Sequence, residues 1–257
     1  MLIDTHCHLD AGYFGEGADA VIERARAEGV IGFVAVGVGR DLEPARSAVA
    51  LAARRPDVWA TVGVHPHDAA SLDDAGFAEL EALAGAPRVV AVGEIGLDYH
   101  YLRSPKEAQQ AVFRRFIALA RAVKKPIVIH TREAAADTLA ILEEEGAREV
   151  GGVIHCFSED RPFAERALAL GFDLSFSGIV TFKTAVAIKE VAAWAPGDRV
   201  LVETDSPYLA PVPFRGKKCE PMHVVHTARH VAALRGEELD AFAARTTENA
   251  RRRLLLV

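Results

Sequence analysis

Histidine and carboxylate side chains recur at one kind of position in this chain of 257 residues. Short apolar runs that resemble buried strands end on such a residue in six cases. The residues are His6 with His8, His65, Glu94, His130, His155 and Asp205. Imidazole and carboxylate groups without thiolates suit Zn, Mn, Fe or Co and tolerate Mg. Because so many of these groups packed together would be hard to stabilise without cations, the pattern predicts a divalent-metal site.

The number of candidate ligands indicates how many ions to expect. Six protein ligands exceed the needs of one catalytic zinc, so we expect two divalent ions per chain (Mg, Mn or Zn) that share a carboxylate. Glu94 is the expected bridge, because it lies in the middle of the ligand series. Paired ions about 3.5–4 Å apart activate water and stabilise both oxygens of a phosphoryl displacement. Asp205 can bind metal and also accept the proton of the attacking water.

Each candidate ligand also has an ordinary interpretation when it is taken alone. His6 and His8 at strand spacing could be common surface or core residues, and His130 could be a hydrogen-bonded core histidine. Glu94 and Asp205 could belong to structural ion pairs. Only the joint pattern favours the metal site.

The elements that must position these residues form a repeated pattern of an apolar run, a polar loop and a helical stretch. The apolar runs are 1–6, 32–38, 58–65, 88–95, 126–130, 151–156, 172–178 and 199–205. Helical stretches include 18–29, 42–55, 106–125 and 132–146, and a pair at 221–235 and 237–254 follows the last run. Eight such units over this length predict an α/β fold, a single (β/α)8 TIM barrel over residues 1–257 with C-terminal helices. A doubly wound open sheet is the main alternative.

The positions of the polar residues favour the barrel. In a barrel the carboxyl ends of all strands open onto one face, whereas an open sheet would arrange the same residues along a line. Alternation predicts that Val90, Val92 and Glu94 share a face and that Cys7 points away from His6 and His8. Asp4 lies on the face of His6, and we expect it to orient a ligand histidine.

Composition excludes several classes of protein. The net charge of -6 argues against a protein that coats nucleic acid through overall charge. Three cysteines without paired spacing form neither a disulfide framework nor a zinc finger. The first residues lack a basic region, and no run of 18 apolar residues occurs, so we expect a cytoplasmic protein without a membrane span.

Eight short motifs resemble the TatD-type metal-dependent deoxyribonucleases, a family of the amidohydrolase superfamily of barrels. The motifs are DTHCHLD (4–10), GVHPH (63–67), GEIGLDYH (93–100), PIVIHTREA (126–134), HCF (155–157), FSGIVTFK (176–183), ETDSPYLAP (203–211) and FRGKKCEP (214–221). They follow the order and spacing of the family from residue 4 to about residue 221.

The resemblance implies a set of ligands and an activity. It assigns metal binding to His6, His8, Glu94, His130, His155 and Asp205. It also places His65 and Glu203 in the active site, so that Asp205, Glu203 and His65 are the expected catalytic residues. The implied activity is hydrolysis of DNA phosphodiesters, as a 3′-5′ exonuclease that needs divalent cations.

Two positions depart from the family pattern. Cys219 stands where the family usually has Asn, and Ser158-Glu159-Asp160 replaces the small residues that usually follow HCF. We expect the first change to alter loop contacts and the second to add negative charge near the path of the phosphates.

The expected partner is DNA, bound weakly and by its ends. Basic residues of the catalytic-face loops could form a phosphate-binding rim, and Arg132 and Lys217 are the expected substrate contacts. The other members of this rim are Arg103, Lys106, Arg161, Lys183, Arg215 and Lys218. Candidate base-stacking residues are Tyr99, Tyr101, Phe157 and Tyr208.

Four further expectations concern residues around the site. His67, His100 and Asp98 could support the ligands. His223, His226 and His230 share one helical face, which favours a surface stripe over a second metal site. Cys7 and Cys156 are expected to be small packing residues. The chain is expected to be a monomer or a small oligomer.

Two other functions remain open. The first is a hydrolase of the same fold that cleaves a C–N or ester bond, for example a D-aminoacyl-tRNA deacylase. Relatives of that kind often bridge their metals with a carboxylated lysine, and no lysine ends a strand here. The second is a non-enzymatic metal-dependent binding protein, which the complete ligand set argues against.

Overall fold

The computed structural model describes residues 1–256, in which eight parallel strands form one sheet in chain order. The strands are β1 (Leu2–Cys7), β2 (Val30–Gly37), β3 (Val58–Val62), β4 (Val89–Asp98), β5 (Ile127–Arg132), β6 (Gly152–Ile154), β7 (Phe172–Phe176) and β8 (Val200–Val202). The Asp205 N–H donates to the His6 carbonyl at 2.9 Å, and the His8 N–H donates to the Ser206 carbonyl at 2.9 Å. These bonds join the end of the sheet to its beginning, so the predicted barrel is confirmed.

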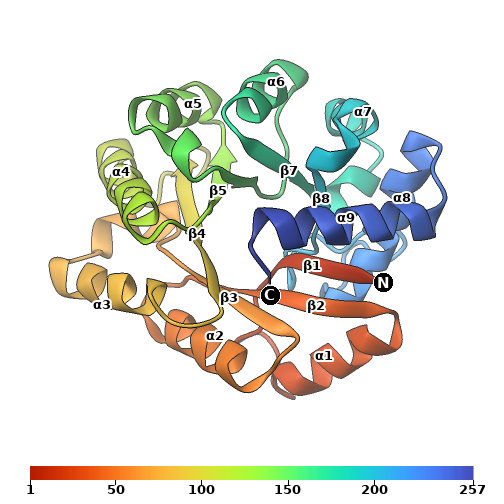
Figure 1. Cartoon of the computed structure of the whole chain (residues 1–257), viewed down its shortest axis with the longest axis horizontal. Coiled ribbons are helices and arrows are strands. Elements are labelled where there is room, and N and C mark those ends of the chain that lie inside the picture. Colours follow the sequence, from red (N-terminus) through yellow and green to blue (C-terminus); the bar gives the residue numbers. More distant parts are fainter. Residues whose placement is uncertain (257) are drawn as a thin grey trace.

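Helices surround the sheet as a ring (Figure 1). They are α1 (Ala18–Ala27), α2 (Glu43–Arg54), α3 (Asp74–Ala84), α4 (Lys106–Val123), α5 (Ala135–Glu144), α6 (Arg161–Ala169), α7 (Val186–Trp194), α8 (Val224–Arg235) and α9 (Leu239–Arg253). In α4, Phe113, Phe116, Ile117 and Ala120 are buried, a helical spacing that turns one face to the sheet. The helix ends where Lys124 adopts φ 55° just before Pro126.

The strands that carry the site differ in length from the predicted runs. β8 ends at Val202, so Glu203 and Asp205 lie in the following loop rather than in the strand. β4 continues to Asp98, which places Glu94 inside a strand rather than at its end. His65 and His155 follow the ends of β3 and β6. All of them still lie toward the carboxyl ends of the strands.

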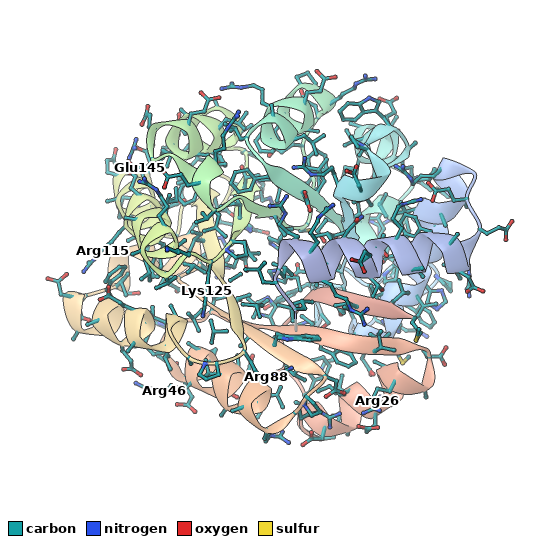
Figure 2. All side chains as sticks on the ribbon, viewed as in Figure 1. Arg26, Arg46, Arg88, Arg115, Lys125 and Glu145 are labelled. Atoms are coloured by element: carbon teal, nitrogen blue, oxygen red, sulfur yellow. The ribbon has the colours of Figure 1, made fainter. Side chains whose placement is uncertain are left out.

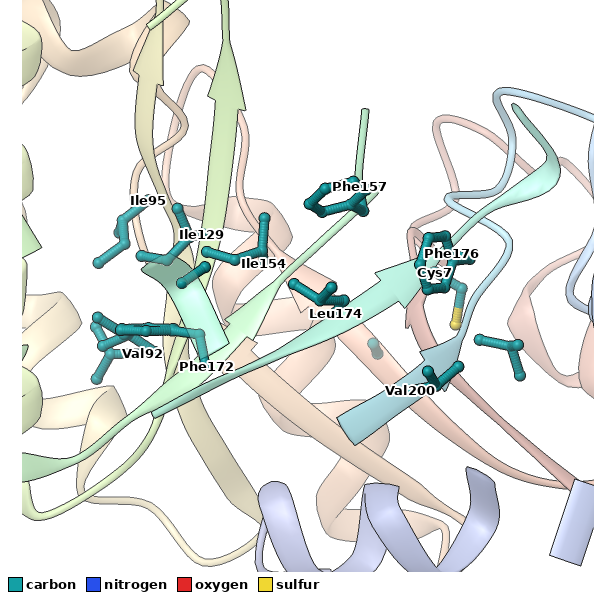
Figure 3. Close-up of a cluster of buried hydrophobic side chains, with 14 of the residues drawn as sticks. Cys7, Val92, Ile95, Ile129, Ile154, Phe157, Phe172, Leu174, Phe176 and Val200 are labelled. Carbon is teal, nitrogen blue, oxygen red and sulfur yellow. The ribbon is translucent and has the colours of Figure 1, made fainter. Parts of the chain in front are cut away.

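Two apolar clusters pack against the sheet. The inner one fills the barrel and contains Val90, Val128, Val153 and Leu201, as the alternation predicts. The outer one lies between the strands and the helices; Figure 3 shows its members Ile95, Ile129, Ile154 and Leu174 close together. Cys7 belongs to this outer cluster and therefore points away from the site, as expected. Complete burial of one such side chain contributes roughly 1.5–3 kcal/mol to folding.

The expected alternation is wrong in the middle of β4. Val92 packs in the outer cluster and does not share the face of Val90. The reason is that the pairing of β3 with β4 shifts register between Val89 and Ala91, just before Val92. The pairing of β4 with β5 shifts again between Val92 and Ile95. Glu94 therefore reaches the barrel mouth through an irregular segment and not through strict alternation.

The amino-terminal end of the barrel is closed by α9 and the residues after it. The Thr247 hydroxyl donates to the Met1 carbonyl at 3.1 Å, and the Asn249 side chain donates to the Val200 carbonyl at 2.9 Å. Leu254 and Leu256 complete the inner apolar cluster. In Figure 1, α9 crosses the view beside β1, with the C-terminus near the centre.

A buried carboxylate ties α9 to the sheet. Asp173 on β7 is fully buried and accepts hydrogen bonds from the side chains of Arg199, Arg252 and Arg253. The Arg253 Nη2–Asp173 Oδ1 distance is 2.8 Å. Since a buried carboxylate requires such partners, this network fixes the position of the last helix.

Charged side chains cover the outside of the helix ring. Figure 2 labels Arg46 on α2 and Arg115 on α4, and both project outward into ion pairs, with Glu79 and Asp74 respectively. Exposed pairs of this kind contribute about 0–1 kcal/mol each. Within residues 1–256, no helix combines the length and apolar character that crossing a bilayer requires.

The expected histidine surface stripe is wrong at its first member. His223 is buried, its Nδ1 accepts the Glu220 N–H at 3.1 Å, and its ring stacks on Phe214 at 4.4 Å. His223 thus holds the loop before α8 in place, and His226 and His230 are half-buried beside it. The start of α8 therefore packs closer to the barrel than the spacing of its three histidines indicates.

Candidate metal centre

The six candidate ligands meet at the carboxyl-terminal mouth of the barrel. They come from β1 (His6), the residue after β1 (His8), β4 (Glu94), β5 (His130), the residue after β6 (His155) and the loop after β8 (Asp205). Potential ligand atoms lie within 4.8 Å of one another in three groups: His6, His155 and Glu203; His6, His8 and Asp205; and His65, Glu94 and His130. Glu94 links the third group to the other two, because its oxygens lie 2.9 Å from His155 Nε2 and 3.5 Å from His6 Nε2. The structure therefore brings all six together.

Glu94 lies between two sets of histidines. Its Oε1 is 2.9 Å from His130 Nδ1 and 2.9 Å from His155 Nε2. Its Oε2 faces the other way and is 3.5 Å from His6 Nε2. One carboxylate thus faces both histidine sets, each through a different oxygen.

Asp205 completes the second set. Its Oδ1 lies 3.5 Å from His8 Nε2 and 3.6 Å from His6 Nε2. At 14%, its side chain is more exposed than that of Glu94 at 4%. Asp205 is therefore the carboxylate of this set that water reaches most easily.

The unpaired polar atoms of the cluster fit a metal centre. Within residues 1–256, both ring nitrogens of His6, His8 Nδ1 and Glu203 Oε2 are buried without a hydrogen-bond partner. Buried polar atoms without partners are costly, and a cation would supply the missing interaction for ligand atoms. Imidazoles and carboxylates without thiolates suit divalent ions such as Zn, Mn and Mg.

Close packing of β4 on β5 requires glycine next to the bridge. Gly96 has φ 138°, and a Cβ atom there would collide with the His130 carbonyl. The missing side chain lets the two strands approach, which brings Glu94 within hydrogen-bond distance of His130.

The electrostatics of the cluster keep its carboxylates charged. Burial opposes ionisation of Glu94, but His155 and His65 hold the pKa of this carboxyl well below its usual range. Burial likewise opposes protonation of His155, but Glu94 and Glu203 raise the pKa of His155 well above its usual value. Burial lowers the pKa of His65 to about 3, so its ring is neutral near pH 7. A cation would therefore compete with a proton at His155 but not at His65.

Glu203 lies behind the ligands rather than in the open site. Its side chain is fully buried, and its Oε1 accepts from His155 Nδ1 at 3.1 Å and from the Cys156 N–H at 2.6 Å. Carboxylates in this position fix the ring orientation and the tautomer of a ligand histidine.

Asp98 supports a second ligand from the same strand as Glu94. It is buried, and its Oδ2 is 3.2 Å from His130 Nε2 and 3.1 Å from His67 Nε2. Asp98 and His67 therefore lie where residues that support the ligands are expected, and that role stays a prediction. His100 does not lie there, because it is exposed and pairs with Glu133 at 2.6 Å.

Asp4 has a different role from the one expected. Its carboxylate accepts from the Thr204 hydroxyl at 2.6 Å and from the Thr204 and His6 backbone N–H groups at 2.9 and 3.3 Å. Burial raises the pKa of Asp4 to about 8. Asp4 orients no ligand ring, and instead holds the loop after β8 against β1, because its side chain turns toward that junction.

A cavity of about 760 Å³ opens above the ligands. Of the basic residues expected at its rim, Arg103 and Arg132 line it. Lys217 is not among the lining residues, and its Nζ is 5.9 Å from the centre of the Phe214 ring. Arg161 pairs with Glu165 and Lys218 donates to the Tyr13 carbonyl, so ionic and backbone contacts occupy two more of the expected rim residues.

The aromatic residues of the cavity are partly those expected. Tyr101 and Tyr208 line it, whereas Phe157 is buried in the outer core and the Tyr99 hydroxyl donates to Asp137. Tyr13 also lines the cavity, and the sequence argument missed it.

Two more lining residues differ from expectation. Arg40 belongs to the cavity but was not proposed, although its place just after β2 is a signal that could have found it. Cys156 was expected to be a packing residue, yet it lines the cavity, because its φ of 44° turns the chain after β6. Its Sγ lies 3.1 Å from the Ser177 hydroxyl.

Of the residues that depart from the family pattern, Ser158 lines the cavity, whereas Glu159, Asp160 and Cys219 do not. Asp160 accepts the Phe163 N–H at 3.0 Å and thereby caps α6, so its charge serves a helix start. Neither Glu159 nor Asp160 lines the cavity, and the expected negative charge on the phosphate path is not placed there. Cys219 is buried, and its N–H donates to the Pro207 carbonyl at 3.0 Å.

Known proteins resemble this chain over its whole length. A family model described as "TatD related DNase" matches residues 3–254. The uncharacterized metal-dependent hydrolase YabD of Bacillus subtilis is 44% identical over 252 residues, which cover 98% of each chain. A protein of Erwinia tasmaniensis named 3'-5' ssDNA/RNA exonuclease TatD is 36% identical over 257 residues, again 98% of each chain. The crystal structure of YjjV, a TatD homologue of Escherichia coli, is 28% identical, has a TM-score of 0.92, and covers 100% of this chain and 98% of that one.

The comparisons and the geometry agree. The match spans the barrel that carries the ligand cluster, and the relatives of this length are described as metal-dependent hydrolases. The chain therefore belongs to the TatD-related DNase family of metal-dependent hydrolases.

Proposed function

We propose that the protein is a two-metal deoxyribonuclease that removes nucleotides from single-stranded 3′ ends of DNA. The observation that carries the proposal is the position of Glu94, whose two oxygens face two separate histidine sets. The proposed ligands are His6, His8 and Asp205 for one ion and His130 and His155 for the other, with Glu94 shared. The name of the Erwinia relative supports the direction of cleavage.

Divalent cations at these ligands would supply Lewis-acid stabilisation of the phosphoryl oxygens and lower the pKa of the attacking water. The residues of the chain have separate tasks. Asp205, the most exposed of the cluster carboxylates, accepts the proton of the attacking water. His65, neutral near pH 7, faces the cavity and contacts the substrate.

Two tyrosines on one wall of the cavity suit a terminal base. The Tyr208 hydroxyl donates to the Tyr13 hydroxyl at 2.9 Å, and the two rings are 5.8 Å apart. Tyr208 is 48% exposed, so one ring face is available for stacking. A single-stranded end can enter such a mouth, whereas a blunt duplex must first fray.

Because the net charge is -6, we propose that binding is weak and depends on local contacts at Arg132. The second substrate contact predicted from the sequence, Lys217, lies outside the cavity lining and would reach only more distant parts of a strand.

The test compares substrates and metals in one assay. Metal-stripped protein is reconstituted with Mg²⁺, Mn²⁺ or Zn²⁺, its metal content is measured, and it is incubated with DNA labelled at either end. We expect about two ions per chain and a ladder that shortens from the 3′ end of single-stranded DNA. Single-stranded RNA is included, because the name of the Erwinia relative also mentions RNA.

Three outcomes would contradict the proposal. Cleavage inside blunt duplexes at a higher rate than at single-stranded ends would exclude the exonuclease assignment. Hydrolysis of an amide or of a D-aminoacyl ester without cleavage of DNA would identify the same-fold alternative. Absence of specific metal binding would overturn the mechanism itself. The cytoplasmic location and the monomeric or small oligomeric state stay predictions.

A further inference from the structure

One wall of the cavity carries positive charge beside an exposed aromatic ring. Tyr101, in the loop after β4, is 51% exposed and lines the cavity. The guanidinium carbons of Arg132 and Arg103 lie 4.8 and 5.5 Å from the centre of its ring. The ring thus holds two cations close to each other at the edge of the mouth.

These arginines lack the carboxylate partners that most others in the chain have. Within residues 1–256, neither Arg103 nor Arg132 forms an ion pair, and Arg40, which also lines the cavity, forms none either. By contrast, Arg114 on the helix ring pairs with two glutamates. Two unneutralised guanidiniums beside one ring repel each other, and an anion between them would remove this repulsion.

The opposite wall of the cavity has a different character. There the lining residues are Tyr13, Ile179, Tyr208 and Leu209, from the loops after β1, β7 and β8. Arg132 is the last residue of β5, and Arg103 follows β4, the strand next to it. The cavity therefore carries two neighbouring cations at β4 and β5 and mainly aromatic or apolar side chains at the loops after β1, β7 and β8.

We infer that Arg103, Arg132 and Tyr101 form a second phosphate site, separate from the metal centre, that binds a phosphate neighbouring the scissile one. This inference rests on the proposed function and refines it, because it requires substrates that carry at least two phosphates. Planar guanidiniums match phosphate oxygens in pairs, and Tyr101 sets the spacing of the two. The site would favour a polynucleotide over an isolated phosphodiester.

Three small substrates distinguish which neighbouring phosphate is bound. Thymidylyl-thymidine (TpT) carries only the scissile phosphodiester, pTpT adds a phosphate on the 5′ side, and TpTp adds one on the 3′ side. We expect kcat/KM of the wild type to be about tenfold higher for one of the two phosphorylated compounds than for TpT. The difference should lie in KM, because the contact is present before and during the reaction.

The variant R103A/R132A tests the assignment. Both residues are exposed, so their removal leaves the core intact. We expect the variant to lose the tenfold preference, so that its kcat/KM becomes similar for TpT and for the phosphorylated compounds. The matched control is Arg251→Ala, an exposed arginine on α9 at the amino-terminal end of the barrel, which should retain the preference.

A second readout uses longer single-stranded DNA. For the wild type, the logarithm of the binding constant should fall with the logarithm of salt concentration more steeply than for R103A/R132A, by about 0.7 for each phosphate that the variant no longer binds. A variant that is structurally damaged but still binds the same phosphates would leave this slope unchanged.

The results separate this inference from the proposed function. Equal losses of R103A/R132A on TpT and on the phosphorylated compounds, or no preference in the wild type, would overturn the second phosphate site while the nuclease stands. If the wild type cleaves none of the three compounds, the proposed function fails. The three compounds then bind without being cleaved, and their dissociation constants can be measured by calorimetry. The wild type should bind one phosphorylated compound about tenfold more tightly than TpT, and the variant should show no such difference.

Discussion

Replacement of Glu203 by Gln distinguishes a residue that orients a ligand from one that reacts. The sequence resemblance predicts a catalytic role, whereas the structure places this carboxylate behind His155 with no exposed surface. Its Oε1 accepts from His155 at 3.1 Å and from the Cys156 N–H at 2.6 Å. Glu203→Gln keeps an oxygen of similar shape and removes only the charge.

The expected magnitude follows from these two bonds. A charge-assisted hydrogen bond is roughly twice as strong as a neutral one, so each bond should weaken by about 1 kcal/mol. The sum of about 2 kcal/mol corresponds to about 30-fold in the affinity of the metal that His155 binds. This value lies within the 10–100-fold range that is typical of partners of metal ligands.

The assay is a titration of nuclease activity with Mn²⁺. Glu203→Gln should need about 30-fold more metal for half-maximal activity, and its kcat at saturating metal should stay within about threefold of the wild type. The control is Glu190→Gln, an exposed glutamate on α7, which should behave as the wild type. A loss of kcat above about 100-fold at saturating metal, with unchanged metal affinity, would refute the orienting role and support direct catalysis.

Three further predictions follow from the structure. Glu94→Ala should remove the shared ligand and lower kcat, measured by steady-state kinetics, by at least about 100-fold. Elemental analysis of this variant should find fewer than two ions per chain, and full metal content would show that Glu94 is not the bridge. Burial opposes protonation of His155, but Glu94 and Glu203 raise its pKa, so a metal ion must displace a proton from this ring. Metal affinity measured by calorimetry should therefore rise from about pH 6 to about pH 8, with release of a proton. An affinity that is independent of pH would contradict this prediction. Asp173→Asn should lower the free energy of unfolding by about 3 kcal/mol in urea, since it leaves three arginines without their buried anion. The exposed control Glu144→Gln should change it by less than about 1 kcal/mol, and equal effects of the two would show that the α9 network is not stabilising.

Much of the site follows from local sequence patterns. Alternating apolar runs predict the strands, and a ligand-type residue near the carboxyl end of six of them predicts convergence in a barrel. His130 and His155 illustrate this, because Val128 and Val153 below them fill the barrel as alternation requires. Strand periodicity is a property of neighbouring residues, so it can be recognised without the fold.

Other features depend on contacts between segments far apart in the chain. The register shift between β3 and β4 precedes Val92 and turns it outward, although the alternation within β4 predicts the reverse. Asp4 binds Thr204, 200 positions later, and this contact decides its role. Neither the register shift nor the Asp4–Thr204 contact can be recognised from the alternation of residues along one strand.

The sequence by itself therefore determined the barrel, the six candidate ligands and the family motifs, because strand alternation and residue type are local properties. Only the tertiary structure decided which loop side chains face the cavity: Arg40 and Tyr13 do, and Lys217 does not. It also decided that Glu203 supports His155 from behind rather than facing the open cavity. The physical reason is that loop conformations and ion pairs are set by packing between distant elements, for which a single sequence carries no periodic signal.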